Sequence, residues 1–158
     1  MLFIALCLLA LAGCGFQLQA DAELPAEMSA TFVETQDPNS YLVRRLVMLL
    51  EQNGAGIVET PPASATLEIP VNTYRKEILS IGDTARVREY RVLQRVRFRL
   101  VDAQGNVLVP EQTIERSRVI SFDEQDILSA TREEEFYREE LADTVARIML
   151  RELSVSET

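Results

Sequence analysis

One alternating segment constrains the fold of this chain more than any other part of the sequence. In residues 88–101 the even positions are mainly apolar, and the odd positions 91, 95, 97 and 99 are all arginine. The apolar residues of the series are Tyr90, Val92, Val96, Phe98 and Leu100. Successive side chains of a strand point to opposite faces of its sheet. The segment is therefore predicted to be a long strand with one core face and one arginine face.

The residues after this strand predict a hairpin. The polar segment that contains Gly105 is typical of a hairpin turn, and residues 107–122 are predicted to return as the next strand. If Val101 lies opposite the first residue of that strand, Arg97 faces Glu111 across the pair. A cross-strand pair of opposite charges contributes only ~0.2–1 kcal/mol.

Two other segments have the periodicity of amphipathic helices. The first follows residues 37–40, which supply N-cap candidates, and ends near Gly54, which tolerates the left-handed conformation of a helix C-cap. The second runs from about residue 129 to residue 153. Thr131 and Glu134 fit a capping box at its start.

Shorter alternating segments complete the predicted sheet. Residues 29–35 and 65–73 are predicted strands, and residues 57–59 are a candidate for a brief one. Pro70 cannot donate a ladder hydrogen bond, so it is expected at a bulge or a sheet edge. The predicted fold class is α+β, with two helices packed on one face of a roughly four-stranded mixed sheet in the order β-α-β-β-β-α.

The N-terminal segment is predicted to be a bacterial lipoprotein signal peptide. An apolar run ends in Leu-Ala-Gly-Cys at positions 11–14. A transmembrane helix needs ~20 apolar residues, so this shorter run fits a signal peptide better, and a buried core helix is the other alternative. Residues 1–3 contain no Lys or Arg, although a positive n-region is typical. Cleavage before Cys14 would place lipid on its sulfur and on its new amino group.

These boundaries divide the chain into four parts. They are a signal peptide (1–13), a lipidated tether (14–28), a single α+β domain (29–153) and a frayed C-terminus (154–158). Cys7 leaves with the signal peptide and Cys14 carries lipid, so no disulfide is expected in the mature chain.

Composition argues against several classes of function. The formal net charge is −9 at pH 7 and histidine is absent. Nucleic-acid binding needs a basic footprint, so no nucleic-acid partner is expected. Without histidine the chain lacks the commonest general base and metal ligand, and no catalytic residue, metal site or cofactor is predicted. The carboxylates between positions 123 and 135 are interpreted as a solvated helix start, because nothing in the sequence indicates the burial that tunes an acid/base pair.

The basic residues are segregated along the chain. Half of the sixteen lie between Arg75 and Arg99. This concentration suits a phosphate-rich anionic ligand or the polar lumen of a partner, because guanidinium groups match phosphate oxygens. The alternative is a solvent face paired with Glu89, Glu111 and Glu115. The pattern alone leaves both interpretations open.

Several short motifs, taken in order, resemble the outer-membrane lipopolysaccharide (LPS) assembly lipoprotein family, LptE. The resemblance rests on residues 11–18, Leu24 and Pro25, residues 37–40, Asn53 and Gly54, and Glu89 and Tyr90. The family's two-helix architecture is also the one predicted here. One departure is that Gln19 and Ala20 stand where family members usually have an Arg-Gly pair.

The resemblance implies a function. It implies a non-enzymatic lipoprotein on the periplasmic side of the outer membrane that plugs the β-barrel protein LptD, assists its assembly and binds LPS. Gly15 after the cysteine agrees with outer-membrane sorting. Arg86, Arg88 and Arg132 are the positions nearest to the family's LPS-contacting residues. An auxiliary lipoprotein of another envelope transport complex is the alternative function, and an enzyme is a more distant one.

Overall fold

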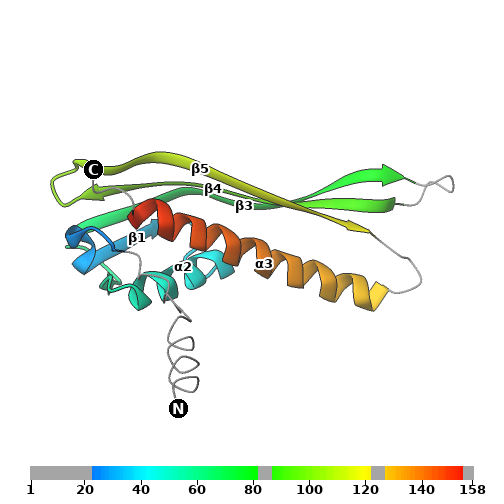
Figure 1. Ribbon diagram of the computed structural model, residues 1–158, viewed down its shortest axis with the longest axis horizontal. Coiled ribbons are helices and arrows are strands. Elements are labelled where there is room, and N and C mark those ends of the chain that lie inside the picture. The colour runs from blue at the N-terminus through cyan, green and yellow to red at the C-terminus, as the bar shows by residue number, and fades with distance from the viewer. Residues whose placement is uncertain (1–22, 82–86, 122–126, 155–158) are drawn as a thin grey trace, which may run out of the picture.

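The computed structural model describes residues 23–81, 87–121 and 127–154. They form, in chain order, the 3-10 helix η2 (Ala26–Ala30), β1 (Thr31–Thr35), α2 (Tyr41–Gln52), β2 (Ile57–Val58), β3 (Ala65–Ile81), β4 (Val87–Asp102), β5 (Val107–Ser121) and α3 (Ile127–Ser154). Both α-helices lie on one face of the sheet (Figure 1). The predicted α+β fold is therefore confirmed. The predicted signal peptide, Cys14 and residues 155–158 lie outside the described residues.

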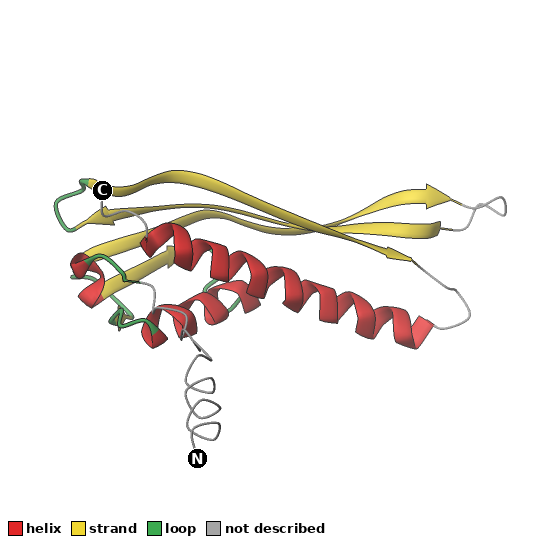
Figure 2. Ribbon diagram, viewed as in Figure 1, coloured by secondary structure: helices red, strands yellow, loops and turns green. Residues whose placement is uncertain are grey.

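The described sheet has five strands rather than the roughly four predicted. Its order is β2-β1-β3-β4-β5, so β5 lies at one edge (Figure 2). β1 pairs in parallel with β2 and β3, whereas β3, β4 and β5 pair antiparallel. The additional strand is β2, whose two residues lie within the candidate for a brief strand at residues 57–59. A strand this short is defined by its pairing with β1 and carries no alternation of its own.

β3 is much longer than the sequence predicted. The predicted strand ended at Thr73, but β3 continues to Ile81, which lies opposite Val87 of β4. The residues after Thr73 do not alternate between apolar and polar, so the sequence pattern ends there. The strand is continued by its pairing with β4. Pro70 lies at a register shift between Glu68 and Val71, which confirms the predicted bulge.

The β4–β5 hairpin closes as predicted but changes register farther along. Val101 lies opposite Val107, as expected. Two register shifts in β4–β5 then place Arg97 opposite Thr113, so the predicted register at Arg97 is wrong, although Arg97 still forms an ion pair with Glu111, at 3.6 Å. Bulges of this kind arise from packing and are not visible in a strand's own alternation.

The first helix begins and ends where its capping residues predicted. The Ser40 side chain accepts a hydrogen bond from the backbone N–H of Val43, at 3.4 Å. Asn53 is the C-cap, and Gly54 after it has a φ of 90°. The second helix differs, because α3 begins at Ile127 and Thr131 lies inside it. The predicted capping box is therefore not the start of this helix.

The core lies between the sheet and the two helices. The even-numbered side chains of β4 are fully buried at Val92, Val96, Phe98 and Leu100, which confirms the predicted core face. The larger hydrophobic cluster joins α2, the C-terminal half of α3 and the strands beneath them. A second, smaller cluster contains Val92, Ile120 and Leu141. We call the sheet region near β1 proximal and the region where β3 ends and β4 begins distal; α2 covers the proximal region, and α3 runs along both (Figure 1).

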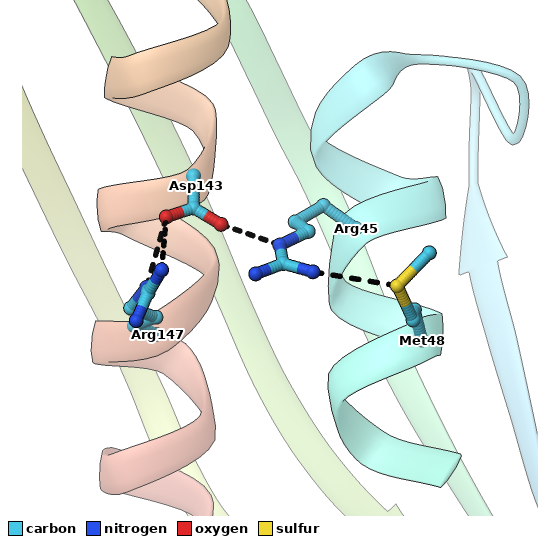
Figure 3. A network of polar contacts seen from close by, with 4 residues as sticks. All are labelled: Arg45, Met48, Asp143 and Arg147. Carbon is cyan, nitrogen blue, oxygen red and sulfur yellow. Dashed lines mark hydrogen bonds and ion pairs between the residues drawn. The ribbon is translucent and has the colours of Figure 1, made fainter. Parts of the chain in front are cut away.

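One carboxylate links the two helices (Figure 3). Asp143 of α3 accepts a hydrogen bond from Nε of Arg45 in α2 and another from Nε of Arg147, at 2.8 Å. Arg45 also points a terminal nitrogen at the sulfur of Met48, 3.3 Å away. Burial raises the pKa of the Asp143 carboxyl, but the hydrogen bonds from both arginines outweigh burial and hold that pKa below its ordinary value.

We expect the substitution Asp143→Asn to destabilise the fold in a pH-dependent way. At neutral pH the loss should be about 0.5–1 kcal/mol, because partly exposed ion pairs are screened by water. A carboxyl with a lowered folded-state pKa stabilises the fold above its unfolded pKa, and this stabilisation is lost as pH falls through the folded pKa. Urea unfolding should therefore show the two proteins converging below about pH 4. Glu139→Gln, on the same helix, is the control, and a difference that persists in acid would contradict the electrostatic origin.

Candidate functional site

Two of the three arginines predicted to contact a ligand lie at the same end of the molecule. Arg88 is the second residue of β4 and Arg132 is near the start of α3. Figure 1 shows both of these element ends in the distal region. The Arg132 side chain is exposed. Arg86, like Cys14, lies outside the described residues.

The odd-numbered face of β4 carries the predicted arginines, and each is paired with a carboxylate of a neighbouring strand. The pairs are Arg91 with Glu77 (3.8 Å), Arg95 with Glu115 (2.6 Å), Arg97 with Glu111 (3.6 Å) and Arg99 with Glu68 (2.6 Å). We call these four arginines the arginine row. Two of the three predicted partners, Glu111 and Glu115, are present. The third, Glu89, instead accepts a hydrogen bond from Ser80, at 2.8 Å.

These contacts make the open face of the sheet polar rather than strongly cationic. The side chains of the arginine row are 42–51% exposed. The hydrogen bond to Glu68 raises the pKa of Arg99 above its ordinary value. Exposed pairs contribute little net stability, so their members can exchange partners with another polar surface at small cost. The paired interpretation of the arginine row is the one that the contacts support.

A second group of charged side chains joins the distal sheet to α3. Three cations lie over tyrosine rings: Lys76 over Tyr90 (4.1 Å to the ring centroid), Arg118 over Tyr137 (5.4 Å) and Arg138 over Tyr74 (5.3 Å). Lys76 also forms an ion pair with Glu134, and Arg118 forms one with Glu140 at 3.6 Å. Sequence reasoning missed this group, because its members come from all three long strands and from α3.

A small polar cavity lies where α2 begins. Its volume is about 70 Å³, and its lining includes Ser40, Asn72, Tyr74, Gln94 and Arg138. The buried Gln94 donates a hydrogen bond to Asn72 (2.7 Å), and Asn72 donates one to Ser40 (2.9 Å). The Tyr74 hydroxyl is buried and has no hydrogen-bond partner among the described residues. Burial, followed by the nearby charge of Glu134, raises the pKa of Tyr74 to about 12.

The described residues show no equipment for a metal site or a membrane span. Within residues 23–81, 87–121 and 127–154, no three His, Cys, Asp or Glu side chains are grouped so that they could hold a metal ion. Neither of the two described α-helices combines the length and the apolar character that crossing a bilayer requires.

Comparison with known families adds the decisive observation. The family described as LptE, lipopolysaccharide-assembly, matches residues 28–153. This chain belongs to the LptE family. The match includes every strand and both α-helices of the described fold, so membership covers the whole domain and not only one motif.

LptE relatives match over nearly the full chain. An LPS-assembly lipoprotein LptE of Photorhabdus laumondii is 26% identical over 154 residues, which are 96% of this chain and 83% of that protein. The LPS-assembly lipoprotein LptE of Yersinia enterocolitica is 28% identical over 162 residues, covering 98% and 75% of the two chains.

Solved structures share the LptE fold found here. The solution structure of an uncharacterized lipoprotein B from Nitrosomonas europaea has a TM-score of 0.69 and 27% identity, with 89% of this chain and 90% of that chain covered. The crystal structure of the rare lipoprotein B from Shewanella oneidensis also has a TM-score of 0.69, at 22% identity, covering 81% and 96%.

We expect the Tyr74 hydroxyl to be dispensable for the stability of this LptE domain at neutral pH. Tyr74→Phe removes a buried hydroxyl that has no hydrogen-bond partner in the part of the chain that the structure describes, so the free energy of unfolding should stay equal or rise by up to about 1 kcal/mol. The raised pKa means that the folded state favours the protonated hydroxyl. The free energy of unfolding that depends on this protonation is fully present below pH ~10 and is lost as pH rises toward the folded-state pKa.

Urea unfolding of Tyr74→Phe and the unaltered chain across alkaline pH would check this. The unaltered chain should lose stability relative to the variant above pH ~10. If the free energies of unfolding of the two proteins change with pH in parallel, the assignment of a raised pKa to Tyr74 is contradicted.

Proposed function

We propose that this LptE-family chain is a non-enzymatic outer-membrane lipoprotein that plugs the LptD β-barrel, assists its assembly and binds LPS on its way to the cell surface. The chain would be anchored through Cys14 on the periplasmic side of the membrane. The family match over residues 28–153 carries this proposal, and the relatives named LPS-assembly lipoproteins support it.

The open face of the sheet supports the plug. A domain inside a barrel lumen meets a polar, hydrated wall rather than lipid. The arginine row and its carboxylate partners form a face of that character along β3, β4 and β5. Because these pairs are half-exposed, they can be exchanged for pairs with lumen side chains.

The anchor follows from the sequence at positions 11–14. One acyl chain holds a protein to a bilayer only marginally, whereas two or more give stable attachment. Lipid on both the sulfur and the amino group of Cys14 would therefore hold the domain permanently beside a membrane partner.

Arg86, Arg88 and Arg132 are the proposed LPS contacts. The distal placement of Arg88 and the exposure of Arg132 are compatible with one shared ligand. Arginine side chains form charge-assisted, often bidentate, hydrogen bonds with phosphate groups.

Co-purification tests the barrel partnership. A tagged full chain, extracted from outer membranes in mild detergent, should bring down LptD. Recovery of a different envelope transport complex would favour the alternative function, an auxiliary lipoprotein, and the absence of any large β-barrel protein would contradict the plug. Cys14→Ser should release the chain from the membrane fraction.

Charge reversal tests the ligand contacts. Changing Arg86, Arg88 and Arg132 together to Glu should weaken binding of purified LPS by at least about tenfold, which corresponds to the loss of one charge-assisted contact. The matched control reverses Arg44, Arg116 and Arg151, whose side chains are exposed, and changes the net charge equally. Equal weakening by both triple variants would point to net charge rather than to these three contacts.

A further inference from the structure

Within residues 132–154 of α3, the side chains before Leu141 and those from Leu141 onward are buried very differently. In residues 132–140 no side chain is buried, and Phe136 is 62% exposed. From Leu141 onward the same helix buries one side chain after another against the core. These are Leu141, Ala142, Val145, Ala146, Met149 and Leu153. Among residues 132–154 of α3, the hydrophobic contribution to holding the helix therefore falls mainly on the part from Leu141 onward.

The C-terminal half is also fixed from a second side. α2 packs beside it over the larger hydrophobic cluster, and Asp143 links it to Arg45 (Figure 3). Figure 1 shows that α2 does not extend beneath the N-terminal half of α3. Residues 132–140 therefore lie mainly over the sheet, and Arg138 among them also lines the polar cavity at the start of α2.

The contacts of residues 132–140 with the sheet are polar or cation–π, apart from one ring. Lys76 pairs with Glu134, and Arg118 pairs with Glu140 while lying over Tyr137. Tyr137 packs against the smaller hydrophobic cluster of Val92, Ile120 and Leu141. Because exposed ion pairs are weak, the packing of the Tyr137 ring is the main interaction that holds this segment on the sheet.

We infer that residues 132–140 of α3 form a strap that detaches from the distal sheet while the helix from Leu141 onward stays in place. Regions with few buried apolar contacts open locally at a free energy below that of global unfolding. Once detached, so short a helical segment is marginal in water, so its turns open as well. This inference does not depend on the barrel or on LPS.

Opening the strap would change the character of the distal region. The side chains that Tyr137 helps to cover, Val92 and Ile120, are now 0% and 7% exposed. Detachment would uncover them on the helix-bearing face, beside Lys76 and Arg118, the cross-strand neighbours of Val92. Both cations would lose their partners in the strap, Glu134 and Glu140. The strap thus controls access to an apolar strip next to cationic residues, a surface that suits an amphipathic anionic molecule.

Native-state amide hydrogen exchange on the full chain tests the strap. Amides of residues 132–140 should exchange about tenfold or more faster than those of residues 142–153, with little dependence on low urea concentrations, as local openings do. Higher salt should accelerate amide exchange selectively in the strap, because salt screens the exposed ion pairs Lys76–Glu134 and Arg118–Glu140. Equal protection and equal urea dependence along the whole of α3 would overturn the inference.

Two truncations within residues 132–140 provide a matched test. Tyr137→Ala should accelerate exchange of residues 132–140 by a further tenfold or so, the effect of losing one ring's packing, and leave residues 142–153 unchanged. Glu139→Ala truncates an exposed side chain of the same segment and should leave exchange in both halves unchanged. Phe136 is not a suitable control, because its ring packs edge-to-face on that of Tyr137, with the centroids 5.5 Å apart. If Tyr137→Ala accelerates both halves equally, α3 opens as one unit and the strap does not exist.

Discussion

The structure depends on the burial of one face of β4. Val92, Val96, Phe98 and Leu100 lie on alternate positions of this strand and are fully inaccessible to solvent. Each such side chain contributes ~1.5–3 kcal/mol when it leaves water. Because alternate residues of a strand face opposite ways, burying these four turns the arginine row outward, where charges need no desolvation. The same periodicity therefore produces both the core and the polar open face.

The unequal length of the helices then divides the domain. α2 has 12 residues and α3 has 28, so only the proximal part of the sheet is covered by a helix pair. The proximal region has a continuous hydrophobic core, whereas the distal region relies on a small cluster and on charged side chains above tyrosine rings. Stability and adaptability are thus placed at opposite ends of one sheet. The proposed ligand contacts, Arg88 and Arg132, belong to the adaptable end.

Local signals in the sequence were enough to predict the fold class but not the pairing and register of the strands. Alternation located β4, the N-cap at Ser40 located α2, and Gly54 located the end of that helix. The candidate strand at residues 57–59 is present as β2, but the length of β3 depends on hydrogen bonds to a distant strand, which no local pattern records. The register shifts near Leu100 are likewise a property of the β4–β5 pairing, and they place Thr113 rather than Glu111 opposite Arg97.

For the candidate site, too, the sequence predicted what lies within one strand but not the contacts between distant segments. The sequence identified the arginine row and two of its partners, because the charges alternate within single strands. It could not decide whether those arginines were free or paired, since that depends on side chains of β3 and β5 brought alongside. The tyrosine and cation contacts under the strap were missed entirely, because residues such as Tyr74 and Arg138 are far apart in sequence. Arg86 and Cys14 remain predictions.

The position of β5 at the sheet edge has a consequence for the chain before it meets any partner. An edge strand offers unpaired backbone groups on which another chain can add a strand and begin aggregation. In β5, Pro110 removes one donor, and Arg116 and Arg118 place charge along the strand. These residues disfavour polymerisation through strand addition, so the long hairpin that the domain needs can be exposed without becoming a template for aggregates.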